Sequence, residues 1–382
     1  MVIVFSGGGT AGHFHPARNI AEALAAAMPG VEPYFVGTEG RIEALELPGL
    51  GYSYRLLPVA GLRSPRGGRI LSAAAANMRA IWLLFAAVAR LVPDFRRRGA
   101  AAVVLTGGYV CAPAGIAARL LRIPVVLQEQ NRHPGKATRL LSRWARQIHL
   151  AYPEAAAALP RRARARIRDT GNPIRPLPPP ADRGREAARG ALRLPREGAL
   201  VLVVGGSQGA RKMNSGLIEI LQDDMPIDRE FVLWVTGRAH YEAAVQALGR
   251  VRGERFAVVP YLEPESMYQA LAAADLAVSR AGAMATSEFL AWGLPSILVP
   301  LPTAAADHQT ANARALEAAG AAVHLPERDA RGADLTGAQL WTEVQRLLGT
   351  PGLLAQMSRA ATARARPDAA REVAAAIREV IS

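Results

Sequence analysis

Short apolar runs alternate with alanine-rich segments of helical character along most of the chain. This alternation is typical of parallel sheets that are covered by helices on both faces. In the first half, the predicted strands are residues 2–5, 34–36, 102–105 and 125–127. In the second half, they are residues 200–204, 231–235, 256–260, 276–278 and 296–299. The pattern therefore predicts an α/β fold with two parallel sheets.

A proline-rich stretch, "GNPIRPLPPPADRGR", separates the two halves. Its prolines cannot continue a helix or a central strand, so it is predicted to be an interdomain linker. The halves begin alike, with "VIVFSGGGTAGH" and "LVLVVGGSQGARKMN", each an apolar strand, a glycine-rich turn and a helix start. This similarity predicts two Rossmann-like domains that face one another across a cleft. The predicted divisions are residues 1–171, a linker at 172–181, a second domain at 182–363, and a C-terminal helix at 364–382 that packs back on the first domain.

The glycine-rich turns do not match the common nucleotide motifs well. Gly7, Gly9 and Gly12 fit the spacing of the dinucleotide fingerprint, but no acidic residue ends the next strand to bind a ribose. Neither turn carries the lysine of a P-loop. Each turn is therefore either a phosphate-binding loop or a tight turn without a ligand.

The chain of 382 residues has a net charge of +14, almost entirely from arginine. Such a charge favours polyanions, phosphorylated ligands or an anionic membrane surface. Aromatic residues make up only 5% of the chain and form no basic-aromatic platform, which argues against nucleic-acid binding. The single cysteine, Cys111, is predicted to be a small buried residue in a reducing compartment. No Cys and His cluster and no Asp-x-Asp segment suggests a metal, and no cofactor is expected.

The most apolar segment is "ILSAAAANMRAIWLLFAAVARLVPDFRRR". Asn77 and Arg79 interrupt it, and its uncharged run at 80–89 is shorter than the ~20 residues that span a bilayer, so we do not expect a transmembrane helix. The N-terminus lacks the pattern of a signal peptide, and an intracellular protein is expected. Apolar side chains beside arginines instead predict docking at a membrane surface, through Trp82, Leu83 and Phe85.

Seven segments in order resemble one family: "GGGTAGHFHP", "TGGYVCAP", "EQN", "GNPIR", "GGSQGA", "SRAGAMATSEFLAWGLPSILVP" and "DHQTANA". They resemble the MurG family of UDP-N-acetylglucosamine:N-acetylmuramyl-(pentapeptide) pyrophosphoryl-undecaprenol N-acetylglucosaminyltransferases, and they span residues 7–312. The resemblance implies the GT-B fold, with an acceptor and membrane-binding domain followed by a UDP-sugar-binding domain. The chain departs from the family pattern at Ala11, where a glycine is usual, and at Gln128, where a histidine is usual.

His13 ends the first glycine-rich turn. An imidazole titrates near neutral pH, so His13 could take the proton of an acceptor hydroxyl. The resemblance points to the same residue, as a base or as a phosphate ligand. Glu129 is the alternative base, and Tyr109 and Asn131 would line the acceptor side. For His15, beside Pro16, an ordinary turn residue is the expectation.

The second half would bind the sugar nucleotide. The turn with Ser207 and Gln208 could hold a pyrophosphate on backbone N–H groups, Arg175 could add a charge, and the Glu288 carboxylate suits two ribose hydroxyls. Without the resemblance, these would be a turn, surface residues and packing residues. The resemblance implies that the donor contacts are Thr10, Ala11, Gly12, Asn131, Arg175, Ser207, Gln208, Leu262, Ala283, Met284, Ala285, Thr286, Ser287, Glu288 and Gln309.

The implied reaction is an inverting transfer of N-acetylglucosamine from UDP-N-acetylglucosamine to the C4 hydroxyl of polyprenyl-linked lipid I, which gives lipid II for peptidoglycan synthesis. The implied location is the cytoplasmic face of the bacterial plasma membrane, peripherally bound, with other cell-wall synthesis proteins as further partners. Two alternatives have the same architecture: a UDP-N-acetylglucosamine epimerase and another GT-B glycosyltransferase. A nonenzymatic RNA-binding protein is the third, and the low aromatic content argues against it.

Overall fold

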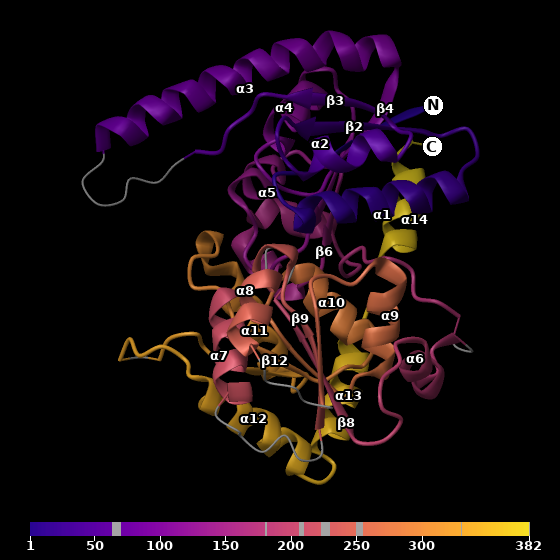
Figure 1. The fold of residues 1–382 in the computed structure, drawn as a ribbon. Helices are drawn as coiled ribbons and strands as arrows, with labels where there is room; N and C mark the ends of the chain where they lie inside the picture. The colour runs from indigo at the N-terminus through magenta and orange to yellow at the C-terminus, as the bar shows by residue number, and fades with distance from the viewer. Residues whose placement is uncertain are drawn as a thin grey trace. The chain divides into compact units, whose positions relative to one another are not determined.

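The computed structural model describes residues 1–62, 70–179, 182–205, 210–222, 230–249, 255–329 and 331–381. The chain divides into two compact units (Figure 1). The first contains Met1–Pro176 together with Pro367–Ser382, and the second contains Leu177–Arg366. Each unit is described by itself below.

The first unit is built on a parallel sheet with the strand order β3-β2-β1-β4-β5-β6-β7. Its strands are β1 (Val2–Ser6), β2 (Glu32–Thr38), β3 (Ser53–Leu57), β4 (Ala100–Leu105), β5 (Val125–Glu129), β6 (Gln147–Leu150) and β7 (Ile167–Asp169). The order reverses between β1 and β4. In open parallel sheets, ligands bind outside the carboxyl ends of the strands at such a switch point.

Helices cover both faces of the first sheet. Val2 and Val4 of β1 pack in one apolar cluster, while Ile3 and Phe5 pack in another, because successive side chains of a strand point to opposite faces. The first cluster includes side chains of α3 (Ile70–Arg98), α4 (Cys111–Leu120) and α5 (Lys136–Leu141). The second includes side chains of α1 (Ala11–Ala27) and α14 (Ala369–Ile381). The short helices are α2 (Ile42–Glu46), η1 (Leu47–Gly49), η2 (Pro153–Ala158) and η3 (Arg161–Arg166).

The C-terminal helix belongs to the first unit. In Figure 1, α14 lies beside α1, at the opposite end of the colour scale. Its fully buried Val373, Ala374 and Ile377 share a cluster with Phe14 and Ile20 of α1. Burial of this apolar face keeps the end of the chain on the domain with which the chain begins.

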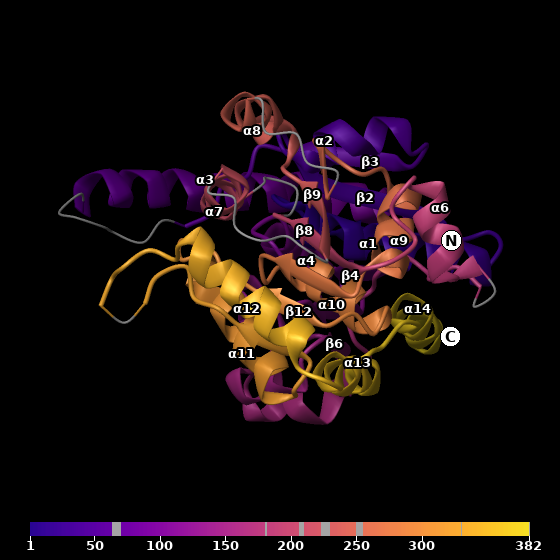
Figure 2. The same ribbon diagram turned by 60° about the horizontal axis from the view of Figure 1, so that its bottom comes forward.

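The second unit has a parallel sheet with the order β10-β9-β8-β11-β12-β13, which reverses between β8 and β11. Its strands are β8 (Ala199–Val204), β9 (Glu230–Val235), β10 (Phe256–Val259), β11 (Leu276–Ser279), β12 (Ser296–Leu298) and β13 (Ala322–His324). Its helices are α6 (Arg185–Ala191), α7 (Arg211–Gln222), α8 (Tyr241–Leu248), α9 (Pro264–Ala273), α10 (Ala283–Ala291), α11 (His308–Ala318), α12 (Gly337–Gly349), α13 (Leu353–Arg364), η5 (Arg238–His240) and η6 (Ala305–Asp307). Helix α12 packs against α7 and α13, and α13 packs against α10 (Figure 2). The sequence prediction of an α/β fold with two parallel sheets is confirmed.

Helix α3 has two contrasting faces. Its Leu91 and Phe95 are buried in the core of the first unit. On another face, large apolar side chains are exposed at the spacing i, i+3, i+4 and i+7, which forms one helical stripe: Met78, Ile81, Trp82 and Phe85. The segment Ser72–Arg98 is long and apolar enough to cross a membrane by length and composition, and only 22% of its most apolar window is buried inside the protein. The predicted interruption at Arg79 lies beside this stripe and is exposed.

Candidate active site

His13 lies where the loops after β1 and β4 meet. Its Nδ1 is 3.1 Å from the Thr10 hydroxyl at the start of α1. Its ring lies against Gly107, because a Cβ added to Gly107 would be 2.5 Å from His13 Cδ2. Gly107 also has a φ of +107°, which side chains disfavour. Only glycine therefore permits this approach of the imidazole to the second loop.

Hydrogen bonds join the same two loops. The Thr106 hydroxyl donates to the backbone oxygen of His13 at 2.7 Å, and the Gly8 N–H donates to the Gly107 oxygen at 3.3 Å. Tyr109 lies against the first loop, since a Cβ on Gly9 would be 3.3 Å from its ring. The structure thus brings His13 and Tyr109, both predicted site residues, to one end of the first sheet.

Glu129 is engaged by its own loop. One carboxylate oxygen accepts from the backbone N–H of Asn131 at 3.1 Å and from the Asn131 side chain at 3.4 Å, and the other accepts from the Gly135 N–H at 3.1 Å. Burial raises the pKa of Glu129, and hydrogen bonds from Thr138, Asn131 and Gly135 oppose that shift. The carboxylate therefore holds residues 131–138 in place at the end of β5.

Gln128 and Cys111 lie in the core. Gln128 is fully buried and its amide group donates to the Gly171 oxygen at 3.4 Å, so the residue that replaces the usual histidine is bound within the protein. Cys111 is buried, as predicted, and its thiol donates to the Ser6 oxygen at 2.9 Å. Burial raises the pKa of this thiol to about 12, which leaves it uncharged at neutral pH.

The loop that carries Arg175 is bound to the middle of α1. The Asn19 side chain of α1 donates to the Pro173 oxygen at 2.8 Å. Burial alone would raise the pKa of Glu46, but the hydrogen bond from His15 and the nearby positive charges outweigh it, so this pKa is lowered. Those charges belong to His15, Arg18 and Arg175. His15 is 3.0 Å from Glu46, a contact that the sequence did not reveal.

In the second unit, α10 follows β11 after Gly282 and carries most of the predicted donor residues. Ala283 and Thr286 are buried, and the Thr286 hydroxyl donates to the Gly282 oxygen at 3.0 Å. The partly exposed residues of this helix are Met284, Ala285, Ser287 and Glu288. Leu262, after β10, is nearly buried. Ser207 and Gln208 lie outside the described residues.

Arg280, which was not among the predicted site residues, joins loops at the carboxyl end of the second sheet. It is 7% exposed, donates to the oxygens of Val299 (3.1 Å) and Pro300 (3.2 Å), and forms an ion pair with Glu327. These contacts join the loops after β11, β12 and β13. The sequence did carry a signal for this role, because Arg280 directly follows an apolar strand. A charged side chain at such a position is buried only when it has hydrogen-bond or ion-pair partners.

Amide side chains complete the network. Asn312 of α11 is fully buried and donates to the Ala281 oxygen at 3.2 Å. The side-chain oxygen of Gln309 accepts from the Leu301 N–H at 2.9 Å, which leaves its NH₂ group to act as the donor toward a ligand. Asn312 is thus connected to the loop that begins α10, and the predicted donor residue Gln309 is connected to the loop after β12.

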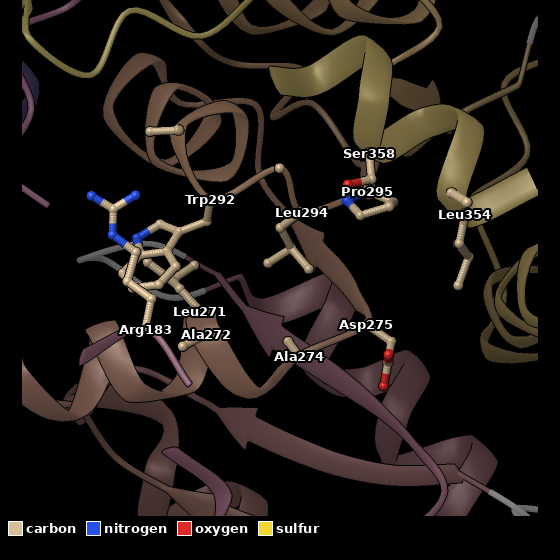
Figure 3. A pocket seen from close by; sticks show the side chains of 13 residues that line it. Arg183, Leu271, Ala272, Ala274, Asp275, Trp292, Leu294, Pro295, Leu354 and Ser358 are labelled. Carbon is tan, nitrogen blue, oxygen red and sulfur yellow. The ribbon is translucent and has the colours of Figure 1, made fainter. Parts of the chain in front are cut away.

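A pocket of the second unit lies at the opposite end of the strands, near their amino ends (Figure 3). Asp275 and Pro295 directly precede β11 and β12, so the pocket opens at the amino ends of these strands. Figure 3 shows Arg183 beside Trp292, and the guanidinium carbon is 6.0 Å from the ring centre. Asp275 is bound to Arg189 and to the Leu200 N–H. This pocket is distinct from the predicted donor residues, which follow the carboxyl ends.

The described residues contain no group of three or more His, Cys, Asp or Glu side chains that could hold a metal ion. Two parallel, doubly wound sheets, together with the matches below, define the class of the chain as a GT-B glycosyltransferase fold. Residues 3–150 match the glycosyltransferase family 28 N-terminal domain, and residues 200–373 match its C-terminal domain. The chain belongs to glycosyltransferase family 28.

Relatives match over nearly the whole chain. One from Salinibacter ruber is 40% identical over 97% of this chain and 95% of its own, and one from Moorella thermoacetica is 40% identical over 97% and 96%. Both are named UDP-N-acetylglucosamine--N-acetylmuramyl-(pentapeptide) pyrophosphoryl-undecaprenol N-acetylglucosamine transferase. The solved structure of Acinetobacter baumannii MurG is similar with a TM-score of 0.74 and 26% identity, covering 99% of both chains. S. aureus MnaA with UDP has a TM-score of 0.67 at 12% identity, covering 99% of this chain and 96% of its own, which shows a shared fold only.

Proposed function

We propose that this chain transfers N-acetylglucosamine from UDP-N-acetylglucosamine to the C4 hydroxyl of the muramoyl sugar of lipid I, which forms lipid II for peptidoglycan synthesis. The similarity to relatives named for this transfer, over 97% of the chain, carries the proposal. The epimerases that share the fold do so at much lower identity, such as 15%.

In this reaction, the acceptor hydroxyl attacks the anomeric carbon of the donor, and the bond from that carbon to the UDP oxygen breaks. The hydroxyl proton passes to His13, and UDP leaves with its added negative charge. The contact of His13 with both glycine-containing loops supports its role as the base. Glu129 is a weaker candidate because its two oxygens are engaged by Asn131 and Gly135.

The donor would bind to the second unit, with Arg175 supplying further positive charge. The start of α10 offers backbone N–H groups and the positive end of the helix to phosphate oxygens. Glu288 would accept from the ribose hydroxyls, and Gln309 would donate to a sugar hydroxyl through its NH₂ group. The turn with Ser207 and Gln208 would hold the pyrophosphate, with the Leu262 backbone against the uracil.

The acceptor side would lie on the first unit, at Tyr109, Glu129 and Asn131. Lipid I has a polyprenyl tail, so the enzyme must work at a bilayer surface. The stripe of Met78, Ile81, Trp82 and Phe85 on α3 is exposed, whereas Leu83 is partly buried. Exposed Arg79 and Arg90 flank the stripe. These features support peripheral docking at the anionic cytoplasmic face of the plasma membrane.

Release of UDP tests the proposed reaction. The purified protein should release UDP from UDP-N-acetylglucosamine only when lipid I is present, with disaccharide-linked lipid as the second product. Conversion of the sugar nucleotide to its epimer without lipid I would favour the epimerase alternative. No reaction in either assay would contradict both enzymatic readings.

Vesicle binding tests the docking surface. The double substitution Trp82→Ser/Phe85→Ser should weaken binding to phosphatidylglycerol vesicles by about tenfold or more, because it removes two large apolar side chains from the interface. Leu45→Ser, at an apolar side chain on α2 that is even more exposed, is the comparison. Activity on a short-chain soluble acceptor should persist in both variants. Equal vesicle binding by all three proteins would place the membrane contact elsewhere.

A further inference from the structure

Glu43 is a buried carboxylate at the first glycine-rich loop that the mechanism above does not use. It is only 1% exposed, on the short helix α2 after β2. Its Oε1 accepts from the backbone N–H of Gly9 at 3.0 Å and from that of Thr38 at 3.1 Å. One oxygen thus joins the loop after β1 to the end of β2.

Two glycines make room for this side chain. A Cβ added to Gly8 would lie 1.7 Å from Glu43 Oε1, and a Cβ on Gly37 would lie 2.8 Å from Glu43 Cβ. Real Cβ atoms do not approach other atoms so closely, so the carboxylate packs where only glycine fits. The run of glycines after β1 is therefore explained in part by contact with the protein's own carboxylate.

The contact extends through the loop to His13. Gly9 has a φ of +86° and directly precedes Thr10, whose hydroxyl is 3.1 Å from His13 Nδ1. Glycine has the greatest backbone freedom of any residue, so an unheld Gly9 would let Thr10 and the imidazole move together. The hydrogen bond to Glu43 restricts this freedom two residues before the helix begins at Ala11.

We propose that Glu43 is a positioning residue that fixes Gly9 and, through Thr10, the imidazole of His13. Its carboxylate occupies the place beside the glycine N–H that an anionic ligand takes in phosphate-binding loops. The first loop thus serves to orient His13, and a substrate anion meets only the groups from Thr10 onward. This inference rests on the proposed function, in which His13 accepts the proton of the acceptor.

Steady-state kinetics of three variants test the proposal. Glu43→Ala should lower kcat by about 10²-fold, the loss expected when a reacting group is displaced by about 1 Å. The KM for UDP-N-acetylglucosamine should change less than kcat, because most of the predicted donor residues, such as Glu288 of α10 and Gln309 of α11, lie outside the first loop. Glu43→Gln keeps an oxygen at the position of Oε1 that still accepts from the Gly9 N–H, so it should restore most of kcat. Glu39→Gln removes the same charge from an exposed neighbour and should have no effect.

Thermal melting establishes that each variant is folded before its kinetics are compared. A folded Glu43→Ala protein with unchanged kcat overturns the proposal. So does a folded Glu43→Gln protein that is as impaired as Glu43→Ala, since the amide oxygen would then not replace the acceptor. If Glu43→Ala does not fold, Gly8→Ala decides, because its methyl group would displace the carboxylate without removing it. Unchanged kcat in that variant also overturns the proposal.

Histidine NMR gives a readout that does not depend on turnover. The imidazole signals of His13, identified by their loss in His13→Ala, should shift in Glu43→Ala and return to their original positions in Glu43→Gln. If the parent protein does not transfer the sugar to lipid I, the proposed function fails, while these spectra still test the link between Glu43 and His13. Unchanged His13 signals in Glu43→Ala contradict that link.

Discussion

The charged side chains that hold loops at the carboxyl ends of the two sheets differ in sign, while amide side chains donate to backbone oxygens in both units. In the first unit, Glu43 and Glu129 accept hydrogen bonds from backbone N–H groups of the loops after β1 and β5. In the second unit, Arg280 and Asn312 donate to backbone carbonyl oxygens of the loops after β11 and β12. The two sheets share a winding pattern, so the difference lies in the loops and not in the topology.

The difference determines which backbone groups remain for a ligand. A carboxylate that accepts N–H groups removes donors from the loop and adds negative charge, which opposes phosphate binding. A guanidinium or amide that donates to carbonyl oxygens leaves the N–H groups uncontested and adds positive charge or none. Gln309, whose oxygen accepts from Leu301 N–H, is an exception in the second unit. This contrast supports the proposed division, in which the proton is transferred at the carboxyl end of the first sheet and the anionic donor binds at that of the second.

His13 provides the largest expected effect and the strongest test of this comparison. His13→Ala should lower kcat by about 10²- to 10⁴-fold, as for the loss of a general base, with little change in UDP binding. Stopped-flow turnover and calorimetric UDP titration measure the two quantities. A collapse of UDP affinity with normal turnover of bound donor would make His13 a phosphate ligand, and the contrast between the carboxyl ends of the two sheets would then be wrong.

Arg280→Ala tests the contacts at the carboxyl end of the second sheet. The substitution leaves the nearly buried Glu327 without its cation, and removal of one partner of a buried ion pair costs about 3–5 kcal/mol. Urea unfolding of the second unit can be followed through the fluorescence of Trp234 and Trp341, which are buried in its core. Arg280→Met/Glu327→Met removes both charges and should be less destabilising than the single change. A loss below about 1 kcal/mol for Arg280→Ala would show that Arg280 does not hold these loops.

Acidification should weaken the first unit through His149 of β6. Burial, with a contribution from Arg168, lowers the pKa of this fully buried imidazole to about 4 from 6.5. The unfolded chain then binds a proton more readily than the folded one, so the free energy of unfolding decreases as pH falls from about 6.5 to 4, by about 3 kcal/mol. His149→Asn should reduce this dependence of the free energy of unfolding on pH, as measured by urea unfolding between pH 7 and pH 4.5. His133→Asn, at an exposed histidine, should leave the pH dependence of the free energy of unfolding unchanged.

Glu288→Ala has the smallest expected effect and sharpens the donor assignment. Loss of hydrogen bonds to a charged acceptor should raise the KM for UDP-N-acetylglucosamine by about 10- to 10²-fold, with kcat at saturation nearly unchanged. Glu288→Gln should have a smaller effect because its oxygen still accepts one hydroxyl. An unchanged donor KM in steady-state kinetics would remove Glu288 from the ribose site.

The nine strands predicted from apolar runs all correspond to observed strands, with ends that differ by one or two residues. The strands β3, β6, β7 and β13 were not predicted. Three of them, β3, β7 and β13, are edge strands. An edge strand is less covered by neighbouring elements, so its sequence needs no continuous apolar run. Strands β3 and β7 are largely exposed. The fourth, β6, is buried but carries Gln147 and His149, whose polar side chains interrupt the pattern.

The sequence by itself determined the architecture and the family, because periodic apolar runs and closely spaced glycine motifs are local features that any similar chain repeats. It also placed His13 beside a glycine-rich turn, although the structure has this residue in the first turn of α1 and not in the turn itself. Only the tertiary structure decided that Glu43, Glu129 and Arg280 hold loops at the carboxyl ends of the two sheets. Their partners, Gly9, Gly135 and Val299, are backbone groups, and the hydrogen bonds to Gly9 and Val299 span 34 and 19 residues of sequence. A backbone N–H or oxygen has no residue type, so no sequence pattern records which side chain will reach it.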